Sequence, residues 1–491
     1  MEGRINFPRV RPLTTTDLTA LLPLIILGVT ATVVMVVISF YRNHRLAALL
    51  TVAGQVASLS TLPACYSLAP LQVTPLIIVD AYALFYLGLT IAASLVVSVL
   101  SFIYAKNRDG KHEEYYILLL LATMGSGVLV SSSHFASLFL GLELLTISLY
   151  AMIGYYVSDE RQLEAGVKYL ILAATSSAFL LFGMALVYAE LGTMEFQKIA
   201  SLLAGEGEYR TLYLLTGTAL MVTGIGFKLA VVPFHMWTPD VYEGASAPVT
   251  AFLATVSKGG MFAVLLRYFV EVNMYRFSSL FLVFTFVAIA SMFVGNLLAI
   301  LQQNVKRILA YSSIAHLGYL LVAFLAGGET AAEAVTFYLV AYFVTTLGAF
   351  GIITLLSGSR GELEAVEDYR GLFWTRPWVA AVFTAMLLSL AGIPLTAGFI
   401  GKYFVIAAGV SAERWALVII LVVNSAIGLY YYLRIVVMMI SQPSEGAAEY
   451  ERMTFGGRVV LGLLAIALLW LGVYPAPLIR IIHAAVSGFL S

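Results

Sequence analysis

Long apolar stretches separated by short polar connections recur along the whole sequence. Most reach the roughly 20 residues that an α-helix needs to cross the hydrocarbon core of a bilayer. Together with the flanking charges they predict about 14 membrane spans, at approximately 18–40, 46–64, 78–104, 115–131, 134–157, 163–190, 211–238, 247–272, 277–301, 305–326, 331–357, 378–409, 412–440 and 457–489. An even number of spans predicts that both termini lie on one side of the membrane.

The connections are too short to hold a soluble domain, so residues 1–491 are interpreted as a single membrane domain. The longest, at 191–210, 358–377 and 441–457, are predicted to be surface loops. An acidic group in one of them is expected to be solvated; it consists of Glu362, Glu364, Glu367 and Asp368. The apolar run after the polar lead 1–17 is too long for a signal sequence, so we expect it to be a retained first span.

Two of the predicted spans contain helix-breaking residues. Pro233 lies in the seventh span, and Gly392 and Pro394 lie in the twelfth. Proline removes a backbone donor and clashes with the preceding turn, so both helices should be interrupted. Paired broken helices are typical of inverted repeats with an ion path near the midplane. We place the repeats at 115–272 and 277–440, after three initial helices at 18–104 and before a C-terminal helix at 457–491.

Composition excludes several classes of protein. The chain is 61% hydrophobic and only 11% charged, with no net charge, whereas soluble domains carry about 25% charged residues. The zero net charge argues against a nucleic-acid partner. The lone Cys65 cannot hold an iron–sulfur cluster, and no predicted span carries a pair of histidines for haem. We therefore expect no cofactor and no metal site in this chain.

Four charged residues interrupt the apolar spans. Glu143 lies in the fifth span, Lys228 in the seventh, Lys258 in the eighth and Lys402 in the twelfth. A charge at the bilayer centre costs roughly 3 kcal/mol on insertion scales, so such residues usually have a function. Three lysines and a glutamate without cofactor ligands indicate proton movement. The alternatives are a static buried ion pair for Glu143 and Lys228, and snorkelling of the amine for Lys258.

Each lysine fits the chemistry of a proton carrier. Burial favours the neutral amine, whereas a carboxylate nearby favours the charged form. Glu143 is the acidic residue nearest the centre of a span, so it is the expected partner of Lys228. Gly259 and Gly260 follow Lys258 and would let water or another helix approach. Lys402 follows the second break and is expected near one exit of the path.

Other polar residues in the spans are secondary candidates. Lys168 either relays protons or anchors a helix end through Glu164, four residues earlier. His235 and His316 titrate near neutral pH, which suits a relay; alternatively, each is a ring satisfied by hydroxyls. Trp237, Tyr242 and the tyrosines at 430–432 are predicted to lie at the membrane interface.

Beyond these patterns, the sequence resembles the antiporter-like subunits of respiratory complex I, specifically the N-type. The stretch GFKLAVVPFHMWTPDVYEGASAPV at 226–249 is typical of the whole antiporter-like group. The stretches that point to the N-type are YRGLFWTRP at 369–377, LSLAGIPLTAGFIGKYFV at 388–405 and SAIGLYYYLR at 425–434. Further matches are ASLFLGLELL at 136–145 and NVKRILAYSSIAHLGYLLVA at 304–323.

The resemblance implies an all-α polytopic fold of 14 transmembrane helices, with two inverted five-helix repeats and broken seventh and twelfth helices. It implies that Glu143 and Lys228 form a coupled pair, that Lys258 is a central relay and that Lys402 is a terminal relay. It also implies proton translocation in a NADH:quinone oxidoreductase of the cell inner membrane. FMN, iron–sulfur clusters and quinone would then belong to partner subunits, and the neighbours would be the M-type subunit and the small K-, J- and A-type subunits.

Alternative functions remain open at this stage. A subunit of a multi-subunit sodium/proton antiporter would share the motif around Lys228, and hydrogenase-linked relatives would also fit. A solute carrier would need convergent recognition groups beside the lysines. A passive scaffold would leave the buried charges unexplained.

Lysines and arginines in the alternate loops show a modest bias that predicts periplasmic termini.

Overall fold

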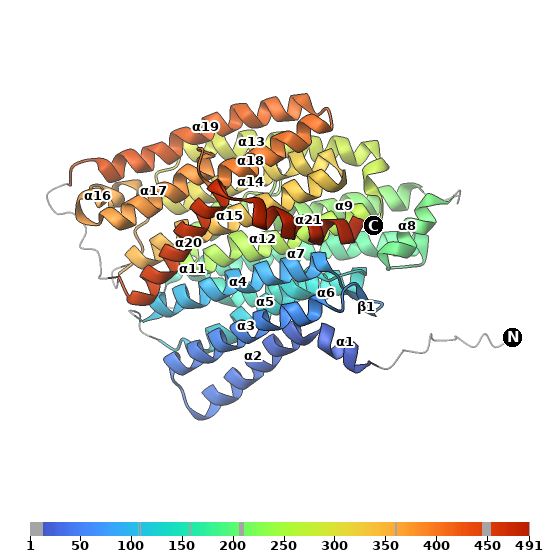
Figure 1. Cartoon of the computed structure of the whole chain (residues 1–491), viewed down its shortest axis with the longest axis horizontal. Coiled ribbons are helices and arrows are strands. Elements are labelled where there is room, and N and C mark those ends of the chain that lie inside the picture. The colour runs from blue at the N-terminus through green and yellow to red at the C-terminus, as the bar shows by residue number, and fades with distance from the viewer. Residues whose placement is uncertain are drawn as a thin grey trace.

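The chain folds into a bundle of helices that run roughly along the longest axis of the molecule (Figure 1). This computed structural model describes residues 13–106, 108, 110–156, 159–205, 211–358, 361–443 and 453–490. The polar lead therefore lies largely outside the described residues. The all-α polytopic fold class is confirmed.

The first part of the bundle consists of three spanning helices and a hairpin. The elements are α1 (Thr15–Ala20), α2 (Leu22–Phe40), α3 (His44–Tyr66), the antiparallel strands β1 (Leu71–Thr74) and β2 (Ile77–Val79), and α4 (Ala81–Ala105). The hairpin was not expected from the sequence. Ile78 N donates to Ser131 O at 2.9 Å, so the hairpin covers the turn at the end of the fourth span.

The next segment contains the fourth to eighth spans. Its elements are α5 (Glu113–Val130), α6 (Phe135–Ile153), α7 (Glu160–Leu191), α8 (Phe196–Ala204), α9 (Thr211–Leu229), α10 (Trp237–Gly244), α11 (Ala247–Phe252), the π-helical turn η1 (Leu253–Ser257) and α12 (Lys258–Glu271). The seventh span breaks between α9 and α10, as Pro233 predicts. The connection at 191–210 contains the helix α8 and is not a simple loop.

The remaining elements complete the spans. They are η2 (Met274–Arg276), α13 (Ser278–Ile300), α14 (Val305–Ala326), α15 (Gly328–Leu356), η3 (Val366–Tyr369), α16 (Leu372–Thr375), α17 (Pro377–Ala391), α18 (Ala397–Ser411), α19 (Trp415–Ile440), α20 (Phe455–Val473) and α21 (Ala476–Leu490). Within the described residues, 13 helices are long and apolar enough to cross a membrane. The broken pair α17–α18 supplies one further span, which gives the expected total.

Two helix pairs, one in each predicted repeat, meet at glycines. A Cβ on Gly125 of α5 would lie 2.5 Å from Leu145 N of α6. In the same way, a Cβ on Gly295 of α13 would lie 2.7 Å from Ala315 N of α14. Small residues allow the backbones of membrane helices to approach closely, which compensates for the absence of a hydrophobic driving force in lipid. The shared packing fits an inverted repeat; the repeat boundaries stay a prediction.

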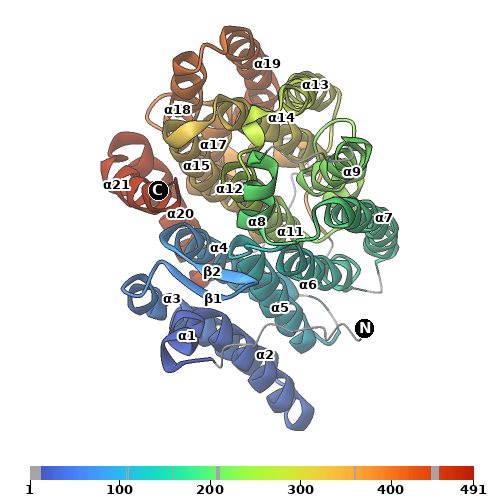
Figure 2. The same ribbon diagram turned by 90° about the vertical axis from the view of Figure 1, so that its right-hand side faces the viewer.

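Three spans occupy the centre of the bundle. The spans formed by α11–α12, α14 and α15 are almost entirely buried inside protein, and the end-on view shows α12, α14 and α15 surrounded by the other helices (Figure 2). These spans carry Lys258, His316 and several tyrosines. Polar side chains on them are therefore shielded from lipid, which makes a polar path along the centre physically tolerable.

The prediction that the acidic loop group is solvated is wrong for Glu362. Its side chain is only 7% exposed and accepts a hydrogen bond from Lys306 Nζ at 2.6 Å. It also accepts from Ala247 N, at the start of α11, at 2.8 Å. Lys306 Nζ donates in addition to Ala245 O at 2.8 Å. The loop therefore folds over the ends of α11 and α14 and ties them together.

Candidate functional site

The first charged group of the site lies between α6, α7 and α9. Glu143 on α6 accepts a hydrogen bond from Ser177 Oγ of α7 at 2.5 Å. Lys228, in the last turn of α9, donates to Thr146 Oγ1 of α6 at 2.9 Å. Thr146 lies three residues after Glu143, on the same helix face. Glu143 acts electrostatically on Lys228, although no ion pair joins them among the described residues.

The second group surrounds Lys258 at the centre of the bundle. This side chain is 1% exposed, and its Nζ donates to Ser313 Oγ of α14 at 2.6 Å. Tyr342 of α15 donates to the same Ser313 Oγ at 2.7 Å. The amine also lies 5.2 Å from the ring centre of Tyr242. The amine is thus satisfied by neutral groups, and no carboxylate within 4.0 Å pairs with it in the described part of the chain.

The backbone around Lys258 is irregular in a way that suits a functional position. The π-helical turn η1 ends at Ser257, immediately before it. Such turns widen the helix by one residue and occur frequently at functional sites. As expected, Gly259 and Gly260 permit close approach, and it is side chains of other helices that approach them. A Cβ on Gly259 would lie 2.4 Å from Phe343 Cζ, and one on Gly260 would lie 2.6 Å from Ser126 Oγ.

A buried histidine continues the polar line from Lys258. His316 of α14 has hydroxyl partners at both ring nitrogens: Tyr338 at 2.8 Å from Nδ1 and Tyr432 at 3.2 Å from Nε2. Tyr432 also bonds Ser312. The His316 and Tyr342 ring centres are 5.6 Å apart. His316 is therefore connected to Lys258 by a short series of contacts. The His316 ring contacts Tyr342, and Tyr342 and Lys258 both donate to Ser313.

The last charged group lies at the break of the twelfth span. Lys402 Nζ donates to Leu390 O at 3.0 Å and to Ala391 O at 2.7 Å. These are the final carbonyls of α17, which lack partners within their own helix. The amine also donates to Ser425 Oγ of α19 at 2.7 Å. A cation is favourable at a helix C-terminus because of the helix dipole, so the break itself provides the site for the lysine.

A buried tyrosine lies between the first two groups. Tyr169 of α7 is 1% exposed. It lies near Ser257, the residue before Lys258, and interacts electrostatically with Glu143 and Tyr242. His316 and Lys402 both contact the ring of Tyr319, at 5.4 Å between ring centres and at 5.1 Å from Nζ. The residues Glu143, Lys228, Lys258, His316 and Lys402 thus lie along one line of polar side chains, with tyrosines and serines between them.

Two secondary candidates lie apart from this line. The Lys168 side chain is 44% exposed and pairs with Glu164 at 2.7 Å and with Asp240 at 3.3 Å, which fits a helix-end anchor better than a relay. Burial alone would raise the pKa of the Asp240 carboxyl, but the bonds to Arg307 and Lys168 hold it below its usual value. His235 lies buried in the break after α9, and no described side chain hydrogen-bonds to it.

The prediction that the aromatic residues lie at the membrane interface is wrong for most of them. Trp237, Tyr242, Tyr431 and Tyr432 are all buried, whereas Tyr430 is exposed. The reason is that α10 and one face of α19 pack against the central spans, so their aromatic faces turn inward. The burial of these tyrosines was missed because aromatic residues are equally common at a membrane interface and in a protein core.

The fold and its line of buried lysines define an antiporter-like membrane subunit. The family described as NADH:quinone oxidoreductase/Mrp antiporter, TM, matches residues 132–428. The protein named NADH-quinone oxidoreductase subunit N from Nitrosospira multiformis is 54% identical, over 96% of this chain and 97% of its own length. The protein of the same name from Methylococcus capsulatus is 51% identical, over 95% of each chain.

Solved structures agree with this assignment. A chain of respiratory complex I from Thermus thermophilus with bound aureothin has a TM-score of 0.81 and 30% identity, and the match covers 94% of this chain and 99% of that one. A chain of the Mrp complex from Dietzia sp. has a TM-score of 0.85 at 21% identity, covering 96% and 98%; this likeness shows the fold alone. The chain belongs to the NADH:quinone oxidoreductase/Mrp antiporter family, and within it to the N-type subunits of complex I.

Proposed function

We propose that this chain moves protons across the membrane through Glu143, Lys228, Lys258 and Lys402, driven by quinone reduction in partner subunits. The observation that carries the proposal is a line of ionisable groups joined by hydroxyls, in which the three lysines are buried and Glu143 is partly exposed. Hydroxyls donate and accept hydrogen bonds, so they can pass a proton between two amines or hold a water that does so. His316 belongs to this line as a further relay between Lys258 and Lys402.

The proposed cycle starts at the first pair. Glu143 is bonded to Ser177 and Lys228 to Thr146, which supports a state in which the two charges are out of contact. Loss of contact with a carboxylate makes a buried lysine more acidic. Lys228 then releases its proton toward Lys258 by way of Tyr169 and water, and Lys402 passes one outward after His316.

The energy for this cycle must come from outside the chain. Moving one charge against 100 mV costs about 2.3 kcal/mol. We expect FMN, iron–sulfur clusters and quinone to reside in partner subunits, so that this chain is a non-redox translocase subunit. The expected neighbours are the M-type subunit and the small K-, J- and A-type subunits. We place the assembly in the inner membrane, with the termini on the periplasmic side.

The test is the effect of single substitutions at the first pair. In the complete assembly in proteoliposomes, Glu143→Ala and Lys228→Ala should each lower quinone reductase turnover and proton pumping together. The exposed Thr175→Ala, on α7 near Ser177, serves as the control and should keep both rates. Wild-type rates in both variants at Glu143 and Lys228 would remove their proposed roles.

The second candidate is a subunit of a sodium/proton antiporter, favoured only by the fold of the Mrp complex. Purification of the intact assembly in mild detergent separates the two. Co-purifying flavin and iron–sulfur absorbance supports the oxidoreductase assignment. A cofactor-free complex that exchanges sodium for protons supports the antiporter.

A further inference from the structure

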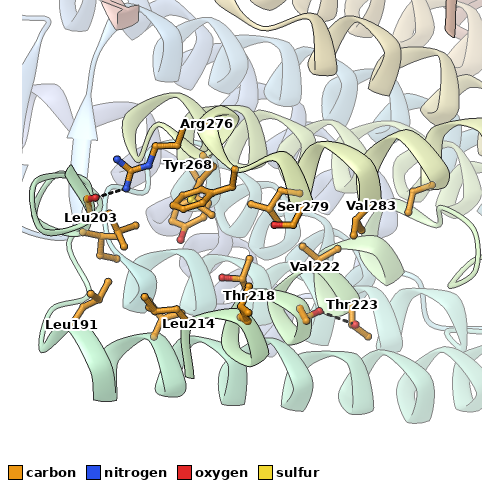
Figure 3. Close-up of a pocket in the computed structure, with 18 of the residues that line it drawn as sticks. Leu191, Leu203, Leu214, Thr218, Val222, Thr223, Tyr268, Arg276, Ser279 and Val283 are labelled. Atoms are coloured by element: carbon orange, nitrogen blue, oxygen red, sulfur yellow. Dashed lines mark hydrogen bonds between the residues drawn. The ribbon is translucent and has the colours of Figure 1, made fainter. Parts of the chain in front are cut away.

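A groove with a volume of about 740 Å³ runs between α9 and α13 (Figure 3). Its floor comes from α7, α8 and α12, and its walls are almost wholly apolar. The volume is within the roughly 300–1,000 Å³ that is typical of small-molecule sites. The groove lies apart from the proton line, because none of the residues that line it is Glu143, Lys228, Lys258 or Lys402.

The groove opens toward the hydrocarbon. Three side chains at its opening are exposed: Leu215 of α9 by 56%, and Val283 and Phe286 of α13 by 44% and 67%. They belong to two spans long enough to cross a membrane. The floor is buried, with Ile199 at 0% and Tyr268 at 6% exposed. An occupant must therefore enter from the membrane, and most of its surface must be apolar.

One end of the groove carries a guanidinium group. Arg276 lies in η2, between the end of α12 and the start of α13, which is the end of two membrane spans. It donates to Leu203 O and lies 4.8 Å from the Phe277 ring centre. Neither contact neutralises its charge, and no ion pair with a carboxylate is found for it among the described residues. Its remaining donors match a phosphate, which arginine binds through parallel hydrogen bonds.

We propose that this groove binds one anionic phospholipid, with its phosphate at Arg276 and an acyl chain along α9 and α13. The combination of an apolar channel open to the bilayer and a cation at headgroup level fits this molecule. A quinone would leave the guanidinium without an anion. A hydrophobic peptide would do the same, and an anionic peptide would have to carry its charge through hydrocarbon. This inference is independent of the proposed proton path.

The test counts the lipid bound to the full-length chain in its assembly. The assembly is placed in nanodiscs of equal phosphatidylglycerol and phosphatidylcholine, extracted in mild detergent, and weighed by native mass spectrometry. Wild type should retain one phosphatidylglycerol more than Arg276→Gln, whose affinity should fall about tenfold or more. Arg414→Gln is the matched control, because Arg414 also lies over a phenylalanine of α13, at 4.3 Å from Phe281, but does not line the groove.

A second variant tests the apolar part without touching the charge. Thr218 lines the groove, so Thr218→Phe should block it and release the same lipid, whereas Val422→Phe, on the exposed face of α19, should not. Equal lipid counts in wild type, Arg276→Gln and Thr218→Phe would overturn the proposal. So would equal retention of phosphatidylcholine in the groove, or a polypeptide segment seated there in an experimental map of the assembly.

Discussion

At the scale of single residues, the structure gives every charged group of the site a polar partner. Lys258 and Lys228 donate to hydroxyls, Lys402 to helix-end carbonyls and a hydroxyl, and Glu143 accepts from Ser177. Burying a charge without such partners would cost several kcal/mol. These neutral partners tolerate both protonation states of an amine, whereas a tight ion pair would hold one state.

The Ser177 hydroxyl is the group whose removal tests the role of Glu143 most directly. Ser177→Ala removes the bond to Glu143 and leaves its carboxylate free to approach Lys228. We expect pumping by the reconstituted assembly to fall severalfold, with a stability change of about 1 kcal/mol. Thr175→Ala is the matched control, because Thr175 Oγ1 bonds only to Ile171 O of its own helix, at 2.9 Å. Equal pumping by the two variants would contradict the role given to Glu143.

At the scale of elements, broken helices create the positions where lysines can be charged. Lys228 is in the last turn of α9, and Lys402 binds the last carbonyls of α17. Both breaks therefore place an amine near the negative end of a helix dipole. Gly392 makes the second break possible, since its φ of 89° is in the left-handed region and a Cβ there would lie 2.7 Å from Lys402 Cδ.

Comparing substitutions at two glycines separates the free-energy cost of a strained backbone from the displacement of Lys402. Gly192 ends α7 with a φ of 69° and nothing within 4 Å of its Cβ position. Gly192→Ala and Gly392→Ala should each lose about 1–2 kcal/mol from the left-handed backbone, measured by thermal unfolding in detergent. Only Gly392→Ala should also lower pumping, because it displaces Lys402. Equal pumping in both variants would show that the position of Lys402 at the break is unimportant.

Most of the helices, the two breaks and the charged residues in the spans could be predicted from the sequence, for a physical reason. Long apolar runs have few alternatives in a membrane, so most of the spans and both expected breaks were correct, and the charges at Glu143, Lys228, Lys258 and Lys402 stood out against them. The last span was expected as one helix at 457–489 but is divided into α20 and α21, because Pro475 between them interrupts a helix. The partners could not be predicted, because Tyr169, Tyr342 and Tyr432 carry no mark that separates a buried hydroxyl from an interfacial one. The burial of Glu362 was also missed, since a loop acid shows no period that reports burial.

At the scale of the whole molecule, a buried ion pair in the second predicted repeat forms hydrogen bonds to the first repeat, from Lys306 to Ala245 O and from Ala247 N to Glu362. Lys306 of α14 bonds Glu362 and also Ala245 O, which precedes α11. Breaking such a pair leaves one buried charge without compensation, which costs about 3–5 kcal/mol, whereas removing both charges is far milder. The pair is therefore expected to hold the repeats in register.

This expectation is tested by unfolding. Lys306→Met should lower the thermal midpoint strongly, and Lys306→Met combined with Glu362→Leu should recover much of the loss. Lys198→Met serves as the control, because the Lys198 side chain is 62% exposed and its pair with Glu195 should contribute at most about 1 kcal/mol. If Lys306→Met were as stable as Lys198→Met, the contact between the two repeats would not depend on the Lys306–Glu362 pair.

The central claim is that protons pass through the amine at the centre of the bundle. The most direct measurement is the proton gradient formed during NADH oxidation by the complete assembly in proteoliposomes, compared between Lys258→Met and Lys198→Met. We predict that Lys258→Met loses most of the gradient and that Lys198→Met matches wild type. A wild-type gradient in Lys258→Met, from an assembly of normal subunit content, would contradict the claim.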